Sequence, residues 1–398
     1  MSTTNSIYKN TSRKEYQLTT EQRNTYRRIS QESIEAKRRA EQGLSSRVHS
    51  VNMPQLNPNQ LMPQLESNGL AALSLFSGGG GLDLGFDKAG YTHQGSYELI
   101  PICGETLKSN RPDWIIHSGP ENGDITKIDW QPSIGSIDII HGGPPCQPFS
   151  IAGQQEGESD DRNMWGEFIR AVNTIKPKSF VAENVLGLLN PKFRGFVQQQ
   201  LLDKLSDYHI HIFELNAADF GIPQQRRRVF LVGFRSKVAF NGFQMPRPTH
   251  RWTDLGTENS GCRTDDLFAK TLVKMMGVRE TLGLLDIGYD ALAPTLRSGF
   301  TGKRNTTSIL NSTAGQKAWG ALEIWPNGVQ ATREKASAFP AKYNHFRLSV
   351  PDCALLQGFP EDWCFAGAVY QVLGQIGNSV VPPVAYQVAK AVALALSL

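Results

Sequence analysis

The sequence has few cysteines, no long hydrophobic run and little net charge. Its 398 residues include five Cys, an odd number without the paired spacing of a zinc site or a disulfide framework. The longest apolar runs, such as residues 392–396, are far shorter than the ~18 residues that a membrane span requires. The first residues also lack the charged and then apolar pattern of a secretory signal. These absences predict a cytoplasmic protein with no membrane span and no bound metal.

What is present is an ordinary globular composition, 39% hydrophobic and 20% charged, in a chain long enough for two or three domains of roughly 150 residues. The net charge of +4 is unevenly distributed, because residues 1–50 hold ten Lys or Arg and only five Glu. Residues 20–42 are polar on nearly every face, so they form either a solvated helix or an arm that contacts nucleic-acid phosphates. Pro, Asn and Gln dominate residues 52–68, which we interpret as a linker.

Alternating apolar segments predict a doubly wound α/β domain. Residues 70–76 form an apolar run typical of a buried strand, and a glycine turn and a helix start follow at once. Helical segments separate most of the later strands, so a mostly parallel sheet covered on both faces is the economical fold. We expect further strands at 95–98, 136–141, 179–183, 209–216 and 228–233, and helices at 102–110, 165–175, 193–205 and 383–398. Residues 245–344 are irregular and predict a second, smaller domain.

The glycine turn after the first strand indicates a nucleotide-like ligand. Glycines there let a ligand approach a helix N-terminus, because no Cβ blocks the way. The turn does not match G-x-G-x-x-G, so a nicotinamide cofactor is not favoured. Glu98 ends the second strand, where such folds place an acid on ribose hydroxyls. Asp124 ends another segment on the same side of the sheet, where its carboxylate could accept a hydrogen bond from an adenine amino group.

The turn Gly142-Gly143-Pro144-Pro145 carries Cys146 at its apex, at the carboxyl end of a strand. Two prolines fix the backbone around this thiol in a loop, where ligands of this architecture bind, so we interpret Cys146 as a nucleophile. His141 points to the strand and is expected to be structural, and the other four cysteines are expected to pack in the interior. Two later strand ends carry further polar groups, namely Glu183 and Asn184 in one and Gln224, Arg226 and Arg228 in the other.

Taken together, these motifs resemble those of the DNA (cytosine-5) methyltransferases, in the usual order over residues 73–390 except for a variable insert. The resemblance implies a Rossmann-like, S-adenosylmethionine-dependent α/β domain in residues 69–243, completed by 367–398. It implies a target-recognition domain in 244–366, preceded by a basic arm and linker in 1–68. The implied activity is sequence-specific methyl transfer to carbon 5 of a flipped-out cytosine in double-stranded DNA, through a covalent Cys146 adduct, within a restriction-modification system.

The resemblance also implies roles for individual residues. Cys146 resembles the nucleophile, Glu183 the carboxylate that holds the target base, and Arg226 and Arg228 the groups that position base and backbone. The implied contacts to S-adenosylmethionine are Phe76, Gly78, Gly80, Gly81, Glu98, Asp124, Ile125, Pro145, Asn378, Ser379 and Val380. Arg297 and Arg304 are expected to read guanines. The full set of expected DNA contacts is Gln147, Ser150, Asn184, Gln224, Thr295, Arg297, Lys303 and Arg304. Two departures from the family are Leu99, where an aromatic residue is common, and Pro351-Asp352, which replaces Arg-Glu.

Two other functions fit part of the pattern. An RNA (tRNA) cytosine-5 methyltransferase would share the catalytic motifs, but that branch has a shorter recognition region and typically no long basic arm. A nicotinamide or flavin oxidoreductase would explain the glycine turn but not the motifs around Cys146, Glu183 and Arg226. We expect a monomer with a cognate restriction endonuclease as a partner. We also expect that removal of residues 1–60 weakens nonspecific DNA affinity and leaves the chemistry intact.

Overall fold

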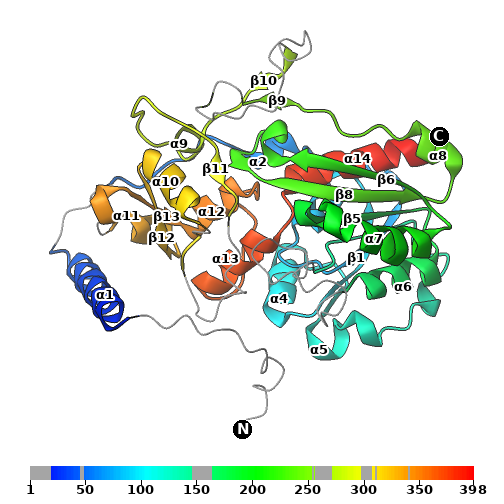
Figure 1. Cartoon of the computed structure of the whole chain (residues 1–398), viewed down its shortest axis with the longest axis horizontal. Coiled ribbons are helices and arrows are strands. Elements are labelled where there is room, and N and C mark those ends of the chain that lie inside the picture. Colours follow the sequence, from blue (N-terminus) through cyan, green and yellow to red (C-terminus); the bar gives the residue numbers. More distant parts are fainter. Residues whose placement is uncertain are drawn as a thin grey trace.

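The structure is a computed structural model of the chain, shown in Figure 1. The residues that it describes are 19–44, 49–145, 164–252, 255, 271–296, 307–309, 312–338 and 341–398. Cys146, Gln147, Ser150, Arg297, Lys303 and Arg304 lie outside these described residues.

A seven-stranded sheet forms the centre of the larger domain (Figure 1), in the order β3-β2-β1-β4-β5-β8-β6. Only β8 runs antiparallel to its neighbours in this sheet. The strands are β1 Ala71–Leu75, β2 Thr92–Glu98, β3 Ile116–Ser118, β4 Ile139–Gly142, β5 Ser179–Val185, β6 His209–Asn216 and β8 Arg227–Phe234. The sheet confirms the expected doubly wound, mostly parallel α/β fold.

Apolar side chains alternate between the two faces of the sheet, and each face carries its own core. On one face Val181 and Val232 pack with residues of α3 and α14, and on the other Phe180 and Leu231 pack with α6. The helices of this domain are α3 Gly81–Lys88, α4 Pro101–Asn110, α5 Gly119–Asn122, α6 Trp165–Ile175, α7 Arg194–Phe196, α8 Lys237–Gly242, α13 Val369–Asn378 and α14 Pro382–Leu396. The two-sided cover explains why the central strands β1, β4 and β5 are buried along nearly their whole length, whereas β2, β3 and β6 near the edges carry more polar residues.

Most predicted elements are present, with two differences. The predicted helix at 193–205 is divided into α7, a π-helical stretch Val197–Leu202 and the 3-10 turn Asp203–Leu205. The short strand β3 has no apolar alternation long enough to predict it. By contrast, the predicted bounds of β6 and α6 agree with the structure.

Residues 369–396 are, within the described parts of the chain, the one helical stretch long and apolar enough to cross a membrane. The sequence predicts no membrane-spanning stretch. The helix breaks after α13 and resumes with α14, and 67% of its most apolar window is buried inside the protein. These helices are therefore core helices, and their hydrophobicity is explained by packing against α3 and the sheet.

The second domain consists of short elements, as its irregular sequence predicts. Its helices are α9 Val278–Thr281, α10 Thr313–Ala321, α11 Arg333–Ser337 and α12 Val350–Leu356. The small sheets pair β9 His250–Arg251 with β10 Val273–Lys274, β11 Ala293–Pro294 with β7 Gln224–Gln225, and β12 Ile324–Gln330 with β13 Phe346–Ser349. Asp352, at the departure from the family's Arg-Glu, pairs with Arg333 at 2.9 Å and caps α12 through Ser349. An ion pair is thus present at this position despite the substitution.

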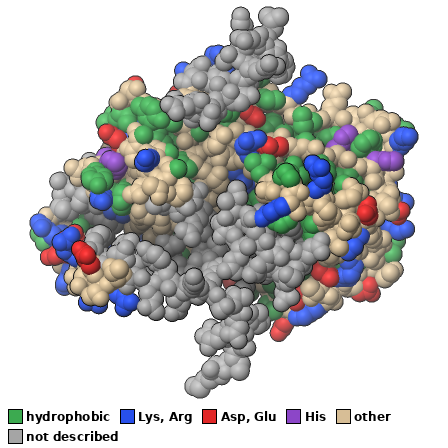
Figure 2. Space-filling view, in the orientation of Figure 1, with side chains coloured by type: hydrophobic (Ala, Val, Ile, Leu, Met, Phe, Trp, Pro, Cys, Tyr) green, Lys and Arg blue, Asp and Glu red, His purple; other side chains and the backbone are tan. Residues whose placement is uncertain are grey.

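The N-terminal region contains a polar helix and a fixed segment. The helix α1 Thr20–Glu41 lies at the edge of the molecule in Figure 1, and Lys and Arg side chains gather there in Figure 2. Residues 52–68, interpreted above as a linker, instead pack on both domains and include α2 Pro58–Leu61. Asn52 and Met62 are buried, with 6% and 0% of their surface exposed. The interpretation as a linker is therefore wrong, because Pro, Asn and Gln here make fixed hydrogen bonds and apolar contacts.

Candidate active site

The glycine turn and the end of β2 meet at the carboxyl edge of the sheet. The Gly78 N–H donates to Glu98 Oε2 at 2.7 Å, and the Ile100 N–H donates to Glu98 Oε1 at 2.8 Å. Burial raises the pKa of the Glu98 carboxyl, while these backbone donors lower it. The Phe76 carbonyl oxygen, at 4.0 Å, is the nearest described atom to a Cβ built on Gly78, so the described residues leave the space beside Gly78 open. Leu99 is 52% exposed on the same edge.

The next glycines of the turn pack against the C-terminal segment. A Cβ on Gly80 would lie 2.7 Å from the Trp363 ring, and one on Gly81 would lie 2.1 Å from the Val380 carbonyl oxygen. Ser379 and Val380 are buried there, whereas Asn378 is exposed. The structure therefore brings the first and last predicted cofactor motifs together, and it gives Gly80 and Gly81 a packing role in addition to the predicted one.

Asp124 lies at the N-terminus of the 3-10 turn Ile125–Lys127, and its carboxylate is already engaged. Its Oδ1 accepts from the Thr126 hydroxyl at 2.7 Å, and its Oδ2 pairs with Lys127 at 3.2 Å. Burial raises the pKa of Asp124, but the hydrogen bonds from Thr126 and Lys127 outweigh it and lower the pKa. Asp124 therefore stays ionised and is able to accept a further hydrogen bond. Ile125 is buried beside it.

Glu183 and Arg228 form a half-enclosed ion pair at the end of β5. Val185 lies opposite Arg228 in the antiparallel pairing of β5 with β8, which brings the Arg228 side chain to this edge. Arg228 Nε lies 2.9 Å from Glu183 Oε1, with 17% and 11% of the two side chains exposed. Burial raises the pKa of the Glu183 carboxyl, against the lowering effect of Arg228 and Arg226. The arrangement orients a carboxyl group and favours its protonated form.

The turn that leads to Cys146 is held against the same strand end. The missing Cβ of Gly143 would lie 3.3 Å from Glu183 Oε2, and the Asn184 amide donates to the Pro144 carbonyl oxygen at 3.2 Å. Asn184 is 2% exposed, so it holds this turn rather than presenting its amide to DNA as predicted. Pro145 is exposed immediately before the undescribed segment. Glu183 therefore lies beside the base of the turn that carries Cys146.

Arg226 is placed differently from its predicted catalytic role. It is 2% exposed, and its Nη2 donates to the carbonyl oxygens of Gly377 at 2.8 Å and Ser379 at 2.9 Å. Its Nε and Nη1 have no hydrogen-bond partner among the described residues. Burial lowers the pKa of Arg226, and Arg228 lowers it further. Arg226 therefore holds the break between α13 and α14 beside the start of β8.

Gln224 joins the two domains instead of facing DNA. It is fully buried, and its Nε2 donates to the Leu356 carbonyl oxygen at 2.8 Å and to Gln357 Oε1 at 3.0 Å. Its Oε1 accepts from the Leu296 N–H at 3.1 Å. Thr295, a predicted DNA contact, is half-buried and donates to the Gln225 carbonyl oxygen at 2.6 Å. The start of the predicted recognition loop is thus anchored to the segment that carries Arg226 and Arg228.

The comparisons with known proteins identify the family of this chain. The family described as C-5 cytosine-specific DNA methylase matches residues 70–393. The chain belongs to this family. Its relatives include the type II methyltransferase M.NgoMIV of Neisseria gonorrhoeae, 32% identical over 332 residues that cover 82% of this chain and 97% of that protein. Another is M.NaeI of Lentzea aerocolonigenes, 31% identical over 338 residues, covering 83% of this chain and 76% of the relative.

Solved structures share the fold of this methylase. A DNA modification methyltransferase encoded within a prophage (E. coli) has a TM-score of 0.53 and 23% identity, over 83% of this chain and 100% of that chain. DNMT2 of Spodoptera frugiperda has a TM-score of 0.50 and 17% identity, over 81% of this chain and 99% of that chain. The expected DNA (cytosine-5) methyltransferase of the type II kind is confirmed by the family and its relatives, and the RNA alternative is less supported.

Several residues to which the sequence assigns no site role assemble the methylase site. Trp363 donates through Nε1 to the Gly79 carbonyl oxygen at 3.2 Å, Gln357 donates to the Ser379 carbonyl oxygen at 2.7 Å, and Gln375 accepts from the Thr106 hydroxyl at 2.6 Å. The two glutamines interrupt apolar segments, and a buried amide needs partners, so this interruption was an available signal. Trp363 carried no comparable signal. It also ties part of the predicted recognition domain to the glycine turn.

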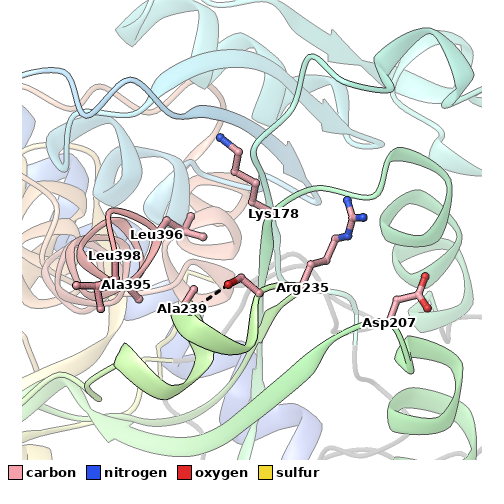
Figure 3. Close-up of a pocket in the computed structure, with 8 residues that line it drawn as sticks. Lys178, Asp207, Arg235, Ala239, Ala395, Leu396 and Leu398 are labelled. Atoms are coloured by element: carbon pink, nitrogen blue, oxygen red, sulfur yellow. Dashed lines mark hydrogen bonds between the residues drawn. The ribbon is translucent and has the colours of Figure 1, made fainter.

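A cavity of about 640 Å³ lies away from these motifs, shown in Figure 3. Lys178 lies beside it just before β5, at the edge of the sheet opposite Glu183. The cationic side chains that line the cavity already have partners within the protein. Lys178 pairs with Asp138 at 2.8 Å, and Arg235 donates to the Lys176 carbonyl oxygen at 2.8 Å. We therefore assign this cavity no part in methyl transfer.

Proposed function

We propose that this methylase transfers a methyl group from S-adenosylmethionine to carbon 5 of a cytosine flipped out of double-stranded DNA, through a covalent bond between Cys146 and carbon 6. The observation that carries the proposal is the position of Glu183. Its carboxyl group is paired with Arg228 and lies against Gly143, at the base of the turn that leads to Cys146. A nucleophile and a carboxylic acid are the two groups that addition to a cytosine ring requires.

The reaction begins when the Cys146 thiolate adds to carbon 6 of the ring. Two electrons of the double bond between carbons 5 and 6 then move toward N3, and Glu183 delivers its proton there, leaving a carboxylate paired with Arg228. The raised pKa of Glu183 supports this role, because it favours the protonated form before addition. Carbon 5 gains the methyl group and then loses its proton to an ordered water. The bond from sulfur to carbon 6 breaks, Cys146 leaves as a thiolate, and N3 returns its proton to the Glu183 carboxylate.

The residues present fit the cofactor. S-Adenosylmethionine supplies the methyl group as a sulfonium, whose leaving group is a neutral thioether. Among the described residues the space beside Gly78 is open to the ligand. The Glu98 carboxylate accepts from the Gly78 and Ile100 N–H groups and keeps acceptor capacity for ribose hydroxyls, because a carboxylate has about four lone-pair sites. Leu99 and Ile100 offer exposed apolar contacts on the same edge. The proposed contacts of Phe76, Asp124, Ile125, Pro145, Asn378, Ser379 and Val380 complete the pocket.

The second domain is proposed to choose the DNA sequence. Thr295, Arg297, Lys303 and Arg304 lie in or beside the segment that Gln224 anchors, and Arg is suited to bidentate contact with guanine. Gln147 and Ser150 are proposed to line the pocket for the flipped base, whose extrusion costs a few kcal/mol. The type II relatives support a cognate restriction endonuclease that acts on the same site. One recognition domain and one pocket are enough for a monomer to act.

The test is to incubate the purified protein with labelled S-adenosylmethionine and unmethylated plasmid DNA, beside Cys146→Ser. Bisulfite sequencing then maps the modified cytosines. Protection of cytosines at one short motif, absent in Cys146→Ser, is the expected result. Methylation that persists in Cys146→Ser would contradict the covalent route, and transfer to tRNA but not to DNA would favour the RNA alternative.

A further inference from the structure

The segment 52–68 lies outside the family match, which begins at residue 70, yet it contacts both domains. We call residues 52–68 the strap. Figure 1 shows this segment running from the second domain, in blue, to α2 beside the larger domain.

The first half of the strap is fixed to the second domain. The Asn52 amide donates to the Leu282 carbonyl oxygen and to Asp352 Oδ1, each at 3.0 Å. The Gln55 N–H donates to the Thr281 carbonyl oxygen at 2.9 Å. A Cβ on Gly283 would lie 1.9 Å from the Met53 carbonyl oxygen, so the strap crosses this residue in close contact. These bonds join α9 and α12 through one buried amide.

The second half is fixed to the larger domain at the end of α3. Met62 is fully buried in the core that α3 and α14 share. The Leu65 N–H donates to the Lys88 carbonyl oxygen at 2.9 Å, and the Asn68 N–H donates to the Gly90 carbonyl oxygen at 2.9 Å. A Cβ on Gly90 would lie 2.1 Å from the Glu66 carbonyl oxygen. Since α3 begins at the glycine turn, this anchor holds the helix that carries the proposed cofactor site.

We propose that the strap is a positioning element, with Asn52 as its key residue, that sets the spacing between the recognition domain and the catalytic domain for DNA binding. The inference rests on the proposed function in one respect, that DNA contacts both domains at once. A tether fixed at both ends reduces the range of domain spacings that the free enzyme samples. DNA then binds two domains that are already arranged relative to each other, and less binding free energy is spent on ordering them.

The experiment lengthens the chain between the strap's contacts with the second domain and its contacts with the larger domain, and it removes neither set of contacts. A flexible Gly-Gly-Ser-Gly-Gly-Ser insertion between Gln55 and Leu56 keeps both sets of contacts but adds a coil of roughly 13 Å end-to-end distance. The matched control carries the same insertion between Gly43 and Leu44, after α1 and before the strap. For each full-length protein, kcat, KM for unmethylated plasmid DNA and Kd for S-adenosylmethionine are measured.

We expect the strap insertion to raise KM for DNA at least fivefold over the control insertion, with kcat at saturating DNA and Kd for the cofactor within twofold. A KM within twofold of the control, or a fall in kcat without a change in KM, would overturn the proposal. If the protein with the strap insertion does not fold, Asn52→Leu replaces it as the test variant, and Gln60→Ala at an exposed position is its control. The same rise in KM for DNA is expected for Asn52→Leu. All these variants keep Cys146 and Glu183, so their outcome is separate from the test of the covalent reaction.

Discussion

Glu183 combines two opposing influences at one carboxyl group. Burial favours its neutral form, and the nearby guanidinium groups of Arg228 and Arg226 favour its charged form. The pKa is raised on balance, so the acid is available to donate a proton and is then stabilised by Arg228 once it has done so. Such a group is more useful for catalysis than either a free surface carboxylate or a carboxyl group buried alone.

We predict that Glu183→Gln lowers kcat by about 10²–10⁴-fold, because the amide cannot transfer a proton to N3. The amide still accepts from Arg228, so the melting temperature changes little. Activity of the parent should fall as pH rises through the raised pKa of Glu183, and this limb of the pH profile should be absent from the residual activity of Glu183→Gln. An unchanged rate constant for methyl transfer in single-turnover assays would exclude Glu183 as the acid.

His141 is a second perturbed group, and it affects stability. Its ring is 1% exposed and stacks on Phe86 with 4.1 Å between ring centroids. Burial lowers the pKa of His141 to about 4. Between pH 6.5 and pH 4 the unfolded chain therefore binds a proton at this residue that the folded chain does not, and stability falls as pH falls. The expected structural role agrees with this burial.

We predict that acidification from pH 7 to pH 4 removes about 3 kcal/mol of unfolding free energy through His141 alone. His141→Leu should lose stability less steeply over this range, as measured by chemical denaturation at each pH. His209→Leu, at an exposed position, is the matched control and should keep the slope of the parent protein. Equal slopes in His141→Leu and the parent would show that His141 does not set the acid sensitivity.

At the scale of elements, the glycine turn, α3 and the break between α13 and α14 form one unit. Gly81 opens α3 directly against the Val380 carbonyl oxygen, and Gly85 packs one turn later against Ala385. Arg226 and Gln357 hold the same break through the Ser379 carbonyl oxygen. A change at any of these contacts should therefore act on the proposed cofactor site without touching the cofactor.

We predict that Gly81→Ala lowers the unfolding free energy by about 1–3 kcal/mol and weakens binding of S-adenosylmethionine, because its Cβ meets a backbone oxygen that cannot move alone. Gly166→Ala in α6 is the control, since a Cβ there meets none of the described residues within 4 Å and Ala favours a helix. Calorimetry for binding and denaturation for stability test the pair. Equal effects in the two variants would contradict the packing role of Gly81.

The sequence predicts elements well where apolar periodicity is strong, as in β6 and α6, and poorly where stability comes from distant contacts. The strap has no periodicity, and its order depends on hydrogen bonds with residues far along the chain such as Leu282 and Asp352. Motifs located the strand ends that carry Glu98 and Glu183. They could not show that Asn184, Gln224 and Arg226 face inward, because the partners of these residues are backbone carbonyl groups that no residue pattern specifies.

For the whole molecule, the strap changes what a truncation should do. The sequence alone predicted that removal of residues 1–60 leaves the chemistry intact, but this deletion removes Asn52 and the α2 contacts. Asp352 and the Leu282 carbonyl oxygen would lose a buried donor, and loss of the strap up to Met62 would also uncover apolar core. The boundary between a dispensable arm and the folded enzyme therefore lies before residue 49.

We predict that deletion of residues 1–44 leaves the melting temperature and kcat close to those of the full chain, while deletion of residues 1–62 lowers the unfolding free energy by about 2 kcal/mol or more. The two truncations differ only in the strap and the short segment before it. Denaturation and methylation assays on both proteins test this difference. A fully stable and active product of the longer deletion would show that the strap's buried contacts contribute little.

The packing of Gly81 against Val380 also bears on how the enzyme is made. About 300 residues separate these two positions, and a ribosome adds roughly 5–20 residues per second. The glycine turn of a nascent chain therefore waits about 15–60 s for the segment that covers it. During translation one face of the sheet remains without α14, exposed to chaperones and to other nascent chains. Methylating activity should accordingly appear late and abruptly in synthesis, once residues 375–386 have emerged.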